Sequence, residues 1–282
     1  MSAAAAHVPR PRRKQPADES RRLDGAEARP APSASLQRGI SFGVLAMLPL
    51  FVGYEIALAA SGTGSHNAAE YALTWPLRPF GDYAPLARLL VLLLIAGVCA
   101  YRCFHSELGL VARIGRVITE GFVAAVVLGP VLLLLQSVFA LPIPALGAHG
   151  HTVPDLAQGV YHVSGAAFEE IVFRVGLQSA FFVLVLQVAL FFSEHERGSR
   201  IFAEIGSIVL GAFVFAAAHL APVVGLFAAG GEPFDAAIFA WRFLAGVMLG
   251  VLFRMRGPGV AAWTHAFFNL ALFVGAGPDV FL

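Results

Sequence analysis

Two adjacent acidic residues stand inside a long apolar stretch of this sequence, SGAAFEEIVFRVGLQSAFFVLVLQ, and a basic residue follows one helical turn later. They are Glu169, Glu170 and Arg174. An ionised side chain at the centre of a bilayer costs about 2.5 to 3.5 kcal/mol on insertion scales, so such groups usually face a protein interior or a wet cavity and serve a function. The stretch is long enough to cross a membrane, and we therefore expect chemistry inside the membrane.

Residue pairs at a spacing of four recur on three separate apolar segments. The pairs are Glu170 with Arg174, Phe215 with His219, and His265 with Asn269. A spacing of four places both members on one face of a helix. Glu169 is rotated by about 100° from Glu170, so one carboxylate can pair with Arg174 while the other points to a different neighbour. Two identical residues can thus have two roles.

The composition is that of an integral membrane protein. Of the 282 residues, 58% are hydrophobic and only 13% are charged, with 24 Phe and a mean hydropathy of +0.75. These values lie far outside the usual range of soluble proteins. The net charge of +1 gives no indication of a nucleic-acid partner, and none is expected. The lipid bilayer is the first partner that the sequence predicts.

The elements that must position these pairs are seven apolar runs, at residues 39–60, 84–104, 117–140, 156–192, 201–220, 236–253 and 259–276. Most are long enough for a helix to cross about 30 Å of hydrocarbon. We therefore predict an all-α, polytopic transmembrane helix bundle of about seven to eight helices. The run 156–192 exceeds one upright crossing, so it should begin at the interface or bend near Gly176. Gly246 and Gly250 should let a neighbouring helix approach closely.

The predicted organisation has three parts. Residues 1–38 form a disordered basic tail, residues 39–155 form three transmembrane helices, and residues 156–282 form the bundle that carries the polar pairs. Arg residues fall in alternate loops on the same side as the basic N-terminus, and the positive-inside rule makes that side cytoplasmic. High Ala, Gly and Arg content with a single Lys is typical of bacteria with GC-rich genomes, so we expect a multi-pass protein of the bacterial inner membrane.

Three motifs occur in order on separate predicted helices: FEEIVFR, FVFAAAH and HAFFN. They match the patterns EExxxR, FxxxH and HxxxN, and in this they resemble the CPBP intramembrane protease family. That family contains the eukaryotic type II CAAX prenyl endopeptidase and bacterial proteins linked to bacteriocin self-immunity. The resemblance covers roughly residues 156–276, and the three motifs together make it specific. It implies that residues 156–282 form a CPBP-like catalytic bundle.

The resemblance implies a role for each motif residue. Glu169 acts as general base with His219, and together they activate a water molecule that attacks a peptide carbonyl. His265 and Asn269 fit the oxyanion and positioning roles, while Glu170, Arg174 and Phe215 form the supporting set. Peptide hydrolysis needs these functions: a base for the proton of water, donors for the oxyanion and an acid for the leaving amine. The substrate is a peptide or a membrane protein.

Three questions stay open at this point. The family resemblance favours a glutamate-dependent mechanism without a cofactor, but Glu169, His219 and His265 could instead hold zinc with an open water position, although no HExxH is present. A non-proteolytic carrier or scaffold could use the same buried residues. Counted along its helix at 1.5 Å per residue, His219 falls roughly 10 to 15 Å further out than Glu169, so the helix start must lie below the membrane surface or the helices must tilt.

Two charged residues outside the motifs, Glu55 and Arg242, also lie within apolar runs. They either line the same cavity or reach water at a helix end.

Overall fold

The structure is a computed structural model that describes residues 32–61, 67–103, 109–141, 156–226 and 231–276. The chain divides between Gln37 and Arg38, and the packing described below is that within Arg38–Leu282. Residues 1–31 of the basic tail expected at residues 1–38 lie outside the described residues, and residues 32–38, which were expected to be disordered, belong to the helix α2.

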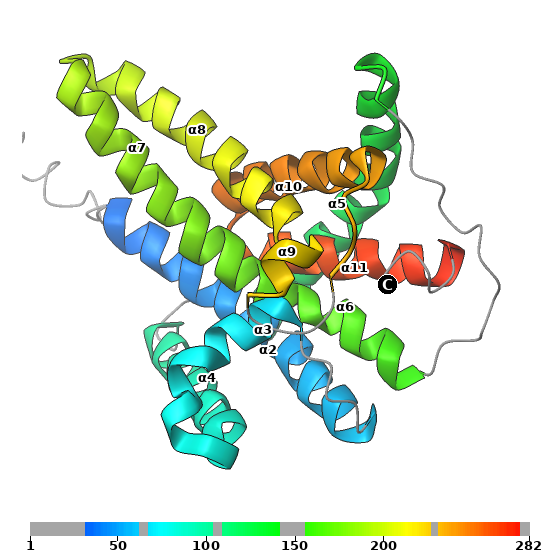
Figure 1. Ribbon diagram of the computed structural model, residues 1–282. Helices are drawn as coiled ribbons and strands as arrows, with labels where there is room; N and C mark the ends of the chain where they lie inside the picture. Colours follow the sequence, from blue (N-terminus) through cyan, green and yellow to red (C-terminus); the bar gives the residue numbers. More distant parts are fainter. Residues whose placement is uncertain (1–31, 62–66, 104–108, 142–155, 227–230, 277–282) are drawn as a thin grey trace, which may run out of the picture. The chain divides into compact units, whose positions relative to one another are not determined.

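The described residues are helical, apart from an isolated parallel bridge between Leu220 and Glu232. The all-α fold class predicted from the sequence is confirmed. The elements, drawn in Figure 1, are α2 Pro32–Ser61, α3 Ala68–Thr74, the 3₁₀-helix η2 Trp75–Tyr83, α4 Ala84–Cys103, α5 Leu110–Val138, α6 Leu156–Glu170, the π-helix η3 Ile171–Gln178, α7 Ser179–Phe192, α8 Glu196–Ala217, α9 Ala221–Val224, α10 Ala236–Arg256 and α11 Pro258–Ala276.

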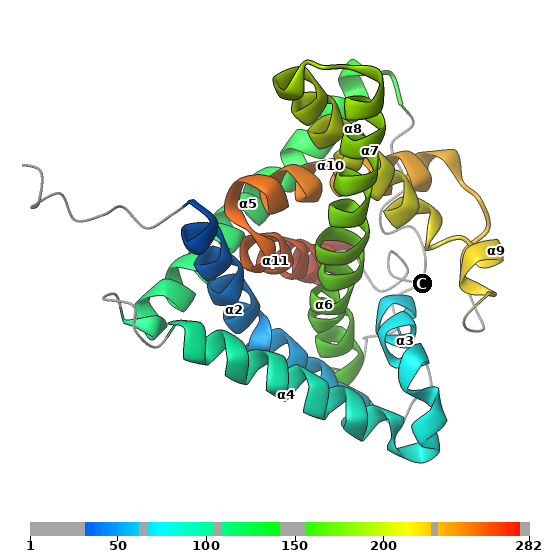
Figure 2. The same ribbon diagram turned by 90° about the vertical axis from the view of Figure 1, so that its left-hand side faces the viewer.

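Within the described residues, six helical segments are long and apolar enough to cross a membrane. They are Gly39–Ala60, Ala68–Cys103, Leu110–Val138, Gly159–Phe192, Glu196–Ala217 and Ala236–Arg256. The sequence predicted a seventh crossing at residues 259–276, where the structure has α11. This helix packs against α5, α6 and α10, and it is the central helix in Figure 2. Because neighbouring helices cover residues 258–268 of α11, this helix can carry Thr264 and His265 in buried positions.

The hairpin of α7 and α8 brings two of the motifs to one level. A Cβ atom at Gly211 would lie 3.3 Å from the Cβ of Gln178, and the rings of Phe173 and Phe215 are 5.3 Å apart. Glu169 lies four residues before Phe173, and His219 lies four residues after Phe215. The mismatch obtained by counting from assumed membrane surfaces does not separate these two residues in the structure, because both lie equally far from the turn of one antiparallel hairpin.

The segment that carries both glutamates is a continuous helix from α6 through η3 to α7. Its middle, Ile171–Gln178, is a π-helix that contains Arg174 and Gly176. The irregularity that the sequence led us to expect near Gly176 is thus a local widening of the helix. Such π segments within α-helices occur frequently at functional sites.

Close packing of α10 depends on two glycines, as expected from their spacing. A Cβ atom at Gly246 would lie 3.0 Å from the Cα of Ala212 on α8, and one at Gly250 would lie 3.0 Å from the Oε1 of Gln178 on η3. The amide nitrogen of Gln178 donates in turn to the carbonyl oxygen of Gly250, at 3.2 Å. A larger residue at either position would separate α10 from the helices that carry the first two motifs.

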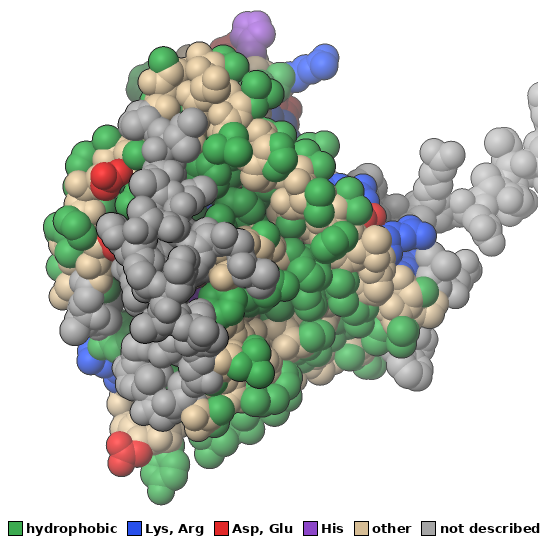
Figure 3. Space-filling view, turned by 90° about the vertical axis from the view of Figure 1, so that its right-hand side faces the viewer, with side chains coloured by type: hydrophobic (Ala, Val, Ile, Leu, Met, Phe, Trp, Pro, Cys, Tyr) green, Lys and Arg blue, Asp and Glu red, His purple; other side chains and the backbone are tan. Residues whose placement is uncertain are grey.

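The outer surface is strongly apolar. Large hydrophobic side chains are exposed along α4, α5, α7 and α8. Figure 3 shows one face on which hydrophobic side chains cover most of the described surface and charged side chains lie near the margins. Exposed apolar area of this extent is what a protein presents to lipid.

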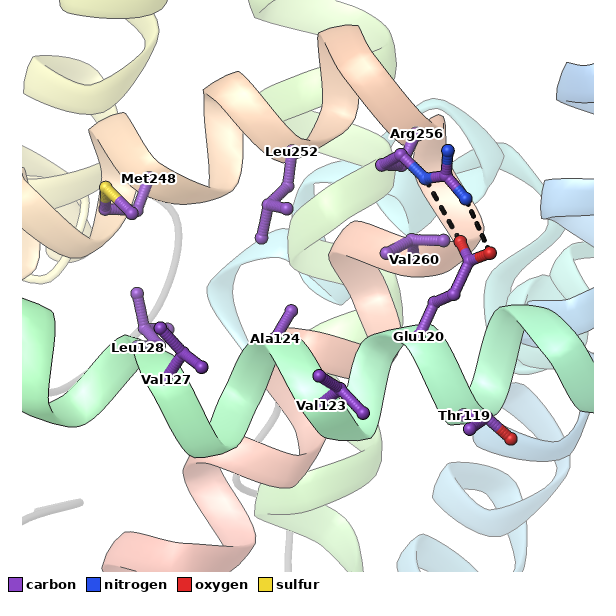
Figure 4. Close-up of a pocket in the computed structure, with 10 residues that line it drawn as sticks. All are labelled: Thr119, Glu120, Val123, Ala124, Val127, Leu128, Met248, Leu252, Arg256 and Val260. Atoms are coloured by element: carbon purple, nitrogen blue, oxygen red, sulfur yellow. Dashed lines mark hydrogen bonds and ion pairs between the residues drawn. The ribbon is translucent and has the colours of Figure 1, made fainter.

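A cavity of about 480 Å³ lies between α5 and α10, and the ion pair of Glu120 with Arg256 stands at one end of it (Figure 4). None of the motif residues lines this cavity. It is therefore separate from the site described next.

Candidate active site

Three helices that are distant in sequence bring an acid and two imidazoles together. Glu169 stands at the end of α6, His219 in the turn directly after α8, and His265 on α11. The Nε2 of His265 lies 3.7 Å from the Oε2 of Glu169, and His219 lies within electrostatic range of the same carboxylate. Three segments that are distant in sequence thus each contribute one acid-base group to the same region.

The two glutamates have different surroundings. The side chain of Glu169 is 14% exposed, whereas Glu170 and Arg174 are both 0% exposed. The Oε2 of Glu170 lies 3.3 Å from the Nε of Arg174, and its Oε1 lies 3.0 Å from the Nδ1 of His265. Glu169 is therefore the carboxylate that water and a substrate can reach, and Glu170 is enclosed by protein groups.

Hydrogen bonds define the protonation of both imidazoles. The Nδ1 of His219 lies 2.8 Å from the carbonyl oxygen of Phe215, which can only accept, so Nδ1 carries the hydrogen. In neutral His219 the free lone pair is then on Nε2. The Nδ1 of His265 faces the carboxylate of Glu170 and donates to it in the same way. In each imidazole, Nε2 is therefore the nitrogen that can interact with a reacting group.

The aromatic residue of the second motif, Phe215, is the common neighbour of the site. Its ring centroid lies 5.1 Å from that of His219 and 5.7 Å from that of His265. The guanidinium of Arg174 lies over the same ring, 5.0 Å from its centroid. The ring of Phe215 therefore packs against both imidazoles and makes a cation–π contact with the buried Arg174.

Asn269 lies one turn after His265 on α11 and is partly exposed. Its amide nitrogen donates to the carbonyl oxygen of His162 on α6 over 3.4 Å, which is long for a hydrogen bond. To serve as an oxyanion donor, the amide would have to exchange this weak bond for one to a substrate. The structure thus places Asn269 beside the site, with its donor directed at the backbone of α6.

A residue that the sequence reasoning missed contacts the reactive carboxylate directly. The amide nitrogen of Asn67 donates to the Oε1 of Glu169 at 2.8 Å. Asn67 precedes α3 and lies 102 positions earlier in the chain. It belongs to no motif, and a single Asn at a helix start is ordinarily explained by capping alone. Nothing in its local sequence could have indicated this contact.

Arg242 and Glu232 form a second group that acts on His219. Arg242 donates to both carboxylate oxygens of Glu232, at 2.5 and 2.6 Å, and both side chains are less than 20% exposed. The backbone N–H of Glu232 donates to the carbonyl oxygen of His219 at 3.0 Å. The ion pair thereby anchors the turn in which His219 stands, and Arg242 also lies within electrostatic range of Glu169.

The other charged residue of the apolar runs, Glu55, has a different partner. It forms an ion pair of 2.6 Å with Arg88 on α4. Glu55 therefore belongs to an interhelical ion pair of the N-terminal helices.

The alternative zinc site was tested on the geometry of the side chains. Across the part of the chain that the structure describes, no group of three or more His, Cys, Asp or Glu residues is arranged to hold a metal ion. This includes the possible ligand set of Glu169, His219 and His265. The zinc alternative stays a prediction that removal of metal tests.

These features define a class of protein: a polytopic helical membrane protein in which a carboxylate and two imidazoles are gathered from three helices. Residues 156–271 match the family model described as Type II CAAX prenyl endopeptidase Rce1-like. This match confirms the resemblance seen in the three motifs, and residues 156–271 contain every predicted site residue. This family implies CAAX-type intramembrane endopeptidase activity, that is, hydrolysis of a peptide or membrane-protein substrate. The comparisons found no curated protein and no solved structure that matches the chain.

Proposed function

We propose that the protein is an intramembrane endopeptidase that hydrolyses a peptide bond with a water molecule activated by Glu169 and His219, without a cofactor. One observation carries the proposal: Glu169 is the more accessible member of the glutamate pair, lies 3.7 Å from His265 and is within electrostatic range of His219. A general base must reach both water and substrate, and the fully buried Glu170 cannot do so.

In the proposed reaction, water lies between Glu169 and the Nε2 of His219. Its oxygen attacks the peptide carbonyl carbon while its proton passes to this acid-base pair. The C–N bond then breaks, and the same pair returns the proton to the leaving amine. Such general acid-base steps contribute typically about 10²- to 10⁴-fold to a rate.

The remaining motif residues support this step. His265 and Asn269 stand one turn apart on α11. His265 supplies a donor for the oxyanion when its Nε2 also carries a proton, and Asn269 does so when its amide exchanges the bond to His162 for one to the substrate. Glu170 orients His265 through Nδ1, and Arg174 balances the charge of Glu170. Phe215 holds both imidazoles in place.

The substitution Glu169→Gln tests the proposal, because it keeps the shape of the side chain and the hydrogen bond acceptor but removes the base. We expect kcat to fall by about 10²- to 10⁴-fold while the protein stays folded. The assay is cleavage of transmembrane and prenylated peptides by the purified protein in detergent. Glu204→Gln is the matched control, since Glu204 pairs with Arg254 on the outer surface and should leave kcat unchanged.

Full cleavage by the Glu169→Gln variant would exclude Glu169 as the base. A non-proteolytic carrier, which would use the same buried acids and bases for proton movement, is distinguished by a parallel measurement in proteoliposomes. Uptake of a solute coupled to protons, together with no cleavage of any peptide by the wild type, would favour the carrier.

We further propose that the protein resides in a bacterial inner membrane with its N-terminus in the cytoplasm, on the basis of its composition and of the alternating Arg distribution. Accessibility of single cysteines introduced near Arg200 and near Phe234 to an impermeant thiol reagent tests the orientation. Labelling near Arg200 from the periplasmic side would reverse it.

A further inference from the structure

We infer that Asn67 is a positioning residue for Glu169, supplied by the part of the chain that precedes residues 156–271. This inference rests on the proposed function, because it assigns Asn67 the task of holding the general base. Asn67 contacts the carboxylate itself and is placed to orient it.

All the polar groups of Asn67 have defined partners, and its carbonyl oxygen accepts from the N–H of Tyr71 at 2.9 Å. The backbone N–H donates to the hydroxyl of Tyr54 at 3.2 Å, and the Oδ1 accepts from the N–H of Ala69 at 2.8 Å. The Nδ2 donates to Glu169. The contact with Ala69 is an N-cap of α3, and a cap requires an oxygen at this position. The cap therefore fixes which side of the amide is the donor, and the donor side faces Glu169.

The helix behind Asn67 is anchored on several sides. Glu70 in the first turn of α3 forms an ion pair with Arg88 of α4, and both residues are almost fully buried. The guanidinium of Arg88 lies 5.6 Å from the ring centroid of Phe168, the residue directly before Glu169. The same packing thus holds Asn67 and the backbone of Glu169, and it restrains the distance between their side chains.

A close approach at Gly165 indicates the same arrangement independently. Gly165 lies one turn before Glu169, and a Cβ atom there would stand 3.0 Å from the Nδ2 of Asn67. This is tighter than an ordinary van der Waals contact. Glycine at this position leaves the space in which the amide reaches the carboxylate.

The chemical consequence concerns the two oxygens of Glu169. The Oε1 is occupied by the amide of Asn67, while the Oε2 faces His265 at 3.7 Å. The carboxylate therefore cannot rotate freely, and one oxygen is directed toward the point where water and the imidazoles meet. Misplacement of a reacting group by 1 Å can lower a rate by about 10²-fold.

The experiment compares three substitutions at Asn67 in the full-length protein. Asn67→Ser keeps a cap but is too short to reach Glu169, and Asn67→Ala removes both contacts. Asn67→Asp keeps the cap and the shape but places a second carboxylate against Glu169. We expect kcat to fall by about 10- to 100-fold in the Ser variant with KM unchanged, because supporting contacts of this kind are typically worth that much.

The Asp variant separates positioning from folding through its pH profile. At neutral pH the two carboxylates repel each other, and kcat should be lowest of the three variants. As the pH falls, the introduced carboxyl takes up a proton and can donate a hydrogen bond as the amide did, so the ratio of its kcat to that of the wild type should rise. A purely structural role would not produce such a pH dependence.

Controls distinguish loss of a cap from loss of the contact. Asp235 caps α10 through the N–H of Ile238 and is exposed, so Asp235→Ala should lower Tm without changing kcat. Gly165→Ala should lower kcat by displacing the amide of Asn67.

The outcomes separate the two proposals. Wild-type kcat and an unchanged pH profile in the Ser and Asp variants would overturn this inference alone and leave the proposed function intact. Absence of cleavage by the wild type on the whole peptide panel would overturn both.

Discussion

The buried ion pair of Glu170 and Arg174 allows a quantitative prediction. Both side chains are 0% exposed, and their charged atoms approach to 3.3 Å inside a segment that we place in the membrane. Removing one partner leaves the other as an uncompensated buried charge, which typically costs about 3 to 5 kcal/mol. We therefore expect Glu170→Gln and Arg174→Met each to lower the free energy of unfolding by about that amount.

The double variant should be much less destabilised than the sum of the single variants. With both charges removed, the principal remaining loss is the cation–π contact of Arg174 with Phe215, worth about 0.5 to 2 kcal/mol. The measurement is equilibrium unfolding in mixed SDS and detergent micelles for the wild type, both single variants and the double variant. The coupling energy should reach about 3 kcal/mol, the upper end for contacting residues.

The ion pair of Arg254 with Glu204 provides the comparison, since these side chains are 33% and 37% exposed. Exposed pairs contribute about 0 to 1 kcal/mol, so the corresponding cycle should show little coupling. The exposed pair should lose less than about 1 kcal/mol of unfolding free energy per single variant, with additive effects. If the Glu170 and Arg174 variants behave in the same way, this part of the site is hydrated and our description of a buried ion pair is wrong.

Three further predictions follow from the site and the packing around it. Arg242→Ala should lower kcat because it frees Glu232, whose backbone N–H donates to the carbonyl oxygen of His219. The double variant in which Arg242 and Glu232 are exchanged should recover part of the lost kcat. Gly246→Val should destabilise the protein by about 1 to 3 kcal/mol, since its side chain would meet the backbone of Ala212. Treatment with EDTA or 1,10-phenanthroline should leave the initial rate of peptide cleavage unchanged.

Each of these predictions has a control or a result that would contradict it. For Gly246, the matched control is Gly97→Val on α4, where an added Cβ atom has no neighbour within 4 Å, and equal stability of both variants would count against close packing. For Arg242, a kcat equal to that of the wild type would show that the turn keeps its position without the ion pair. Loss of cleavage with chelator that zinc alone restores would establish the metal mechanism instead.

The helical architecture and the domain family were predictable because they depend on local pattern. Apolar runs of sufficient length and pairs at a spacing of four each determine a helix face. The close approach at Gly246 and Gly250 was also predictable, since small residues one turn apart allow helices to touch in any fold. These features need no knowledge of which helices are neighbours.

The level of His219 relative to Glu169 was left open by the sequence for a physical reason. Depth was counted from assumed membrane surfaces, whereas the two residues are related through the hairpin of α7 and α8. The contact of Gln178 with Gly211 sets the register of that hairpin, and the register places Glu169 and His219 side by side. Only the pairing of helices, which a single sequence does not encode locally, reveals it.

The contact of Asn67 was not predictable at all. It joins residues 102 positions apart, and the Asn lies outside every motif. The pairing of Arg242 with Glu232 was unforeseen for the same reason, because Glu232 lies in the connection before α10 and its importance arises from its backbone contact with His219.

The enclosure of α11 has a consequence for attempts to isolate the catalytic portion. This helix packs extensively on α5, its Trp263 donates to the carbonyl oxygen of Ala46 on α2 at 2.7 Å, and Gly43 of α2 touches Gly259 at its start. A fragment trimmed to residues 156–271 would expose the wall of α11 that these helices cover. This fragment should therefore be unstable, both alone and when fused to the N-terminal helices of another protein. A fusion should be stable only if the new helices supply a small residue in place of Gly43 and a carbonyl oxygen in place of that of Ala46.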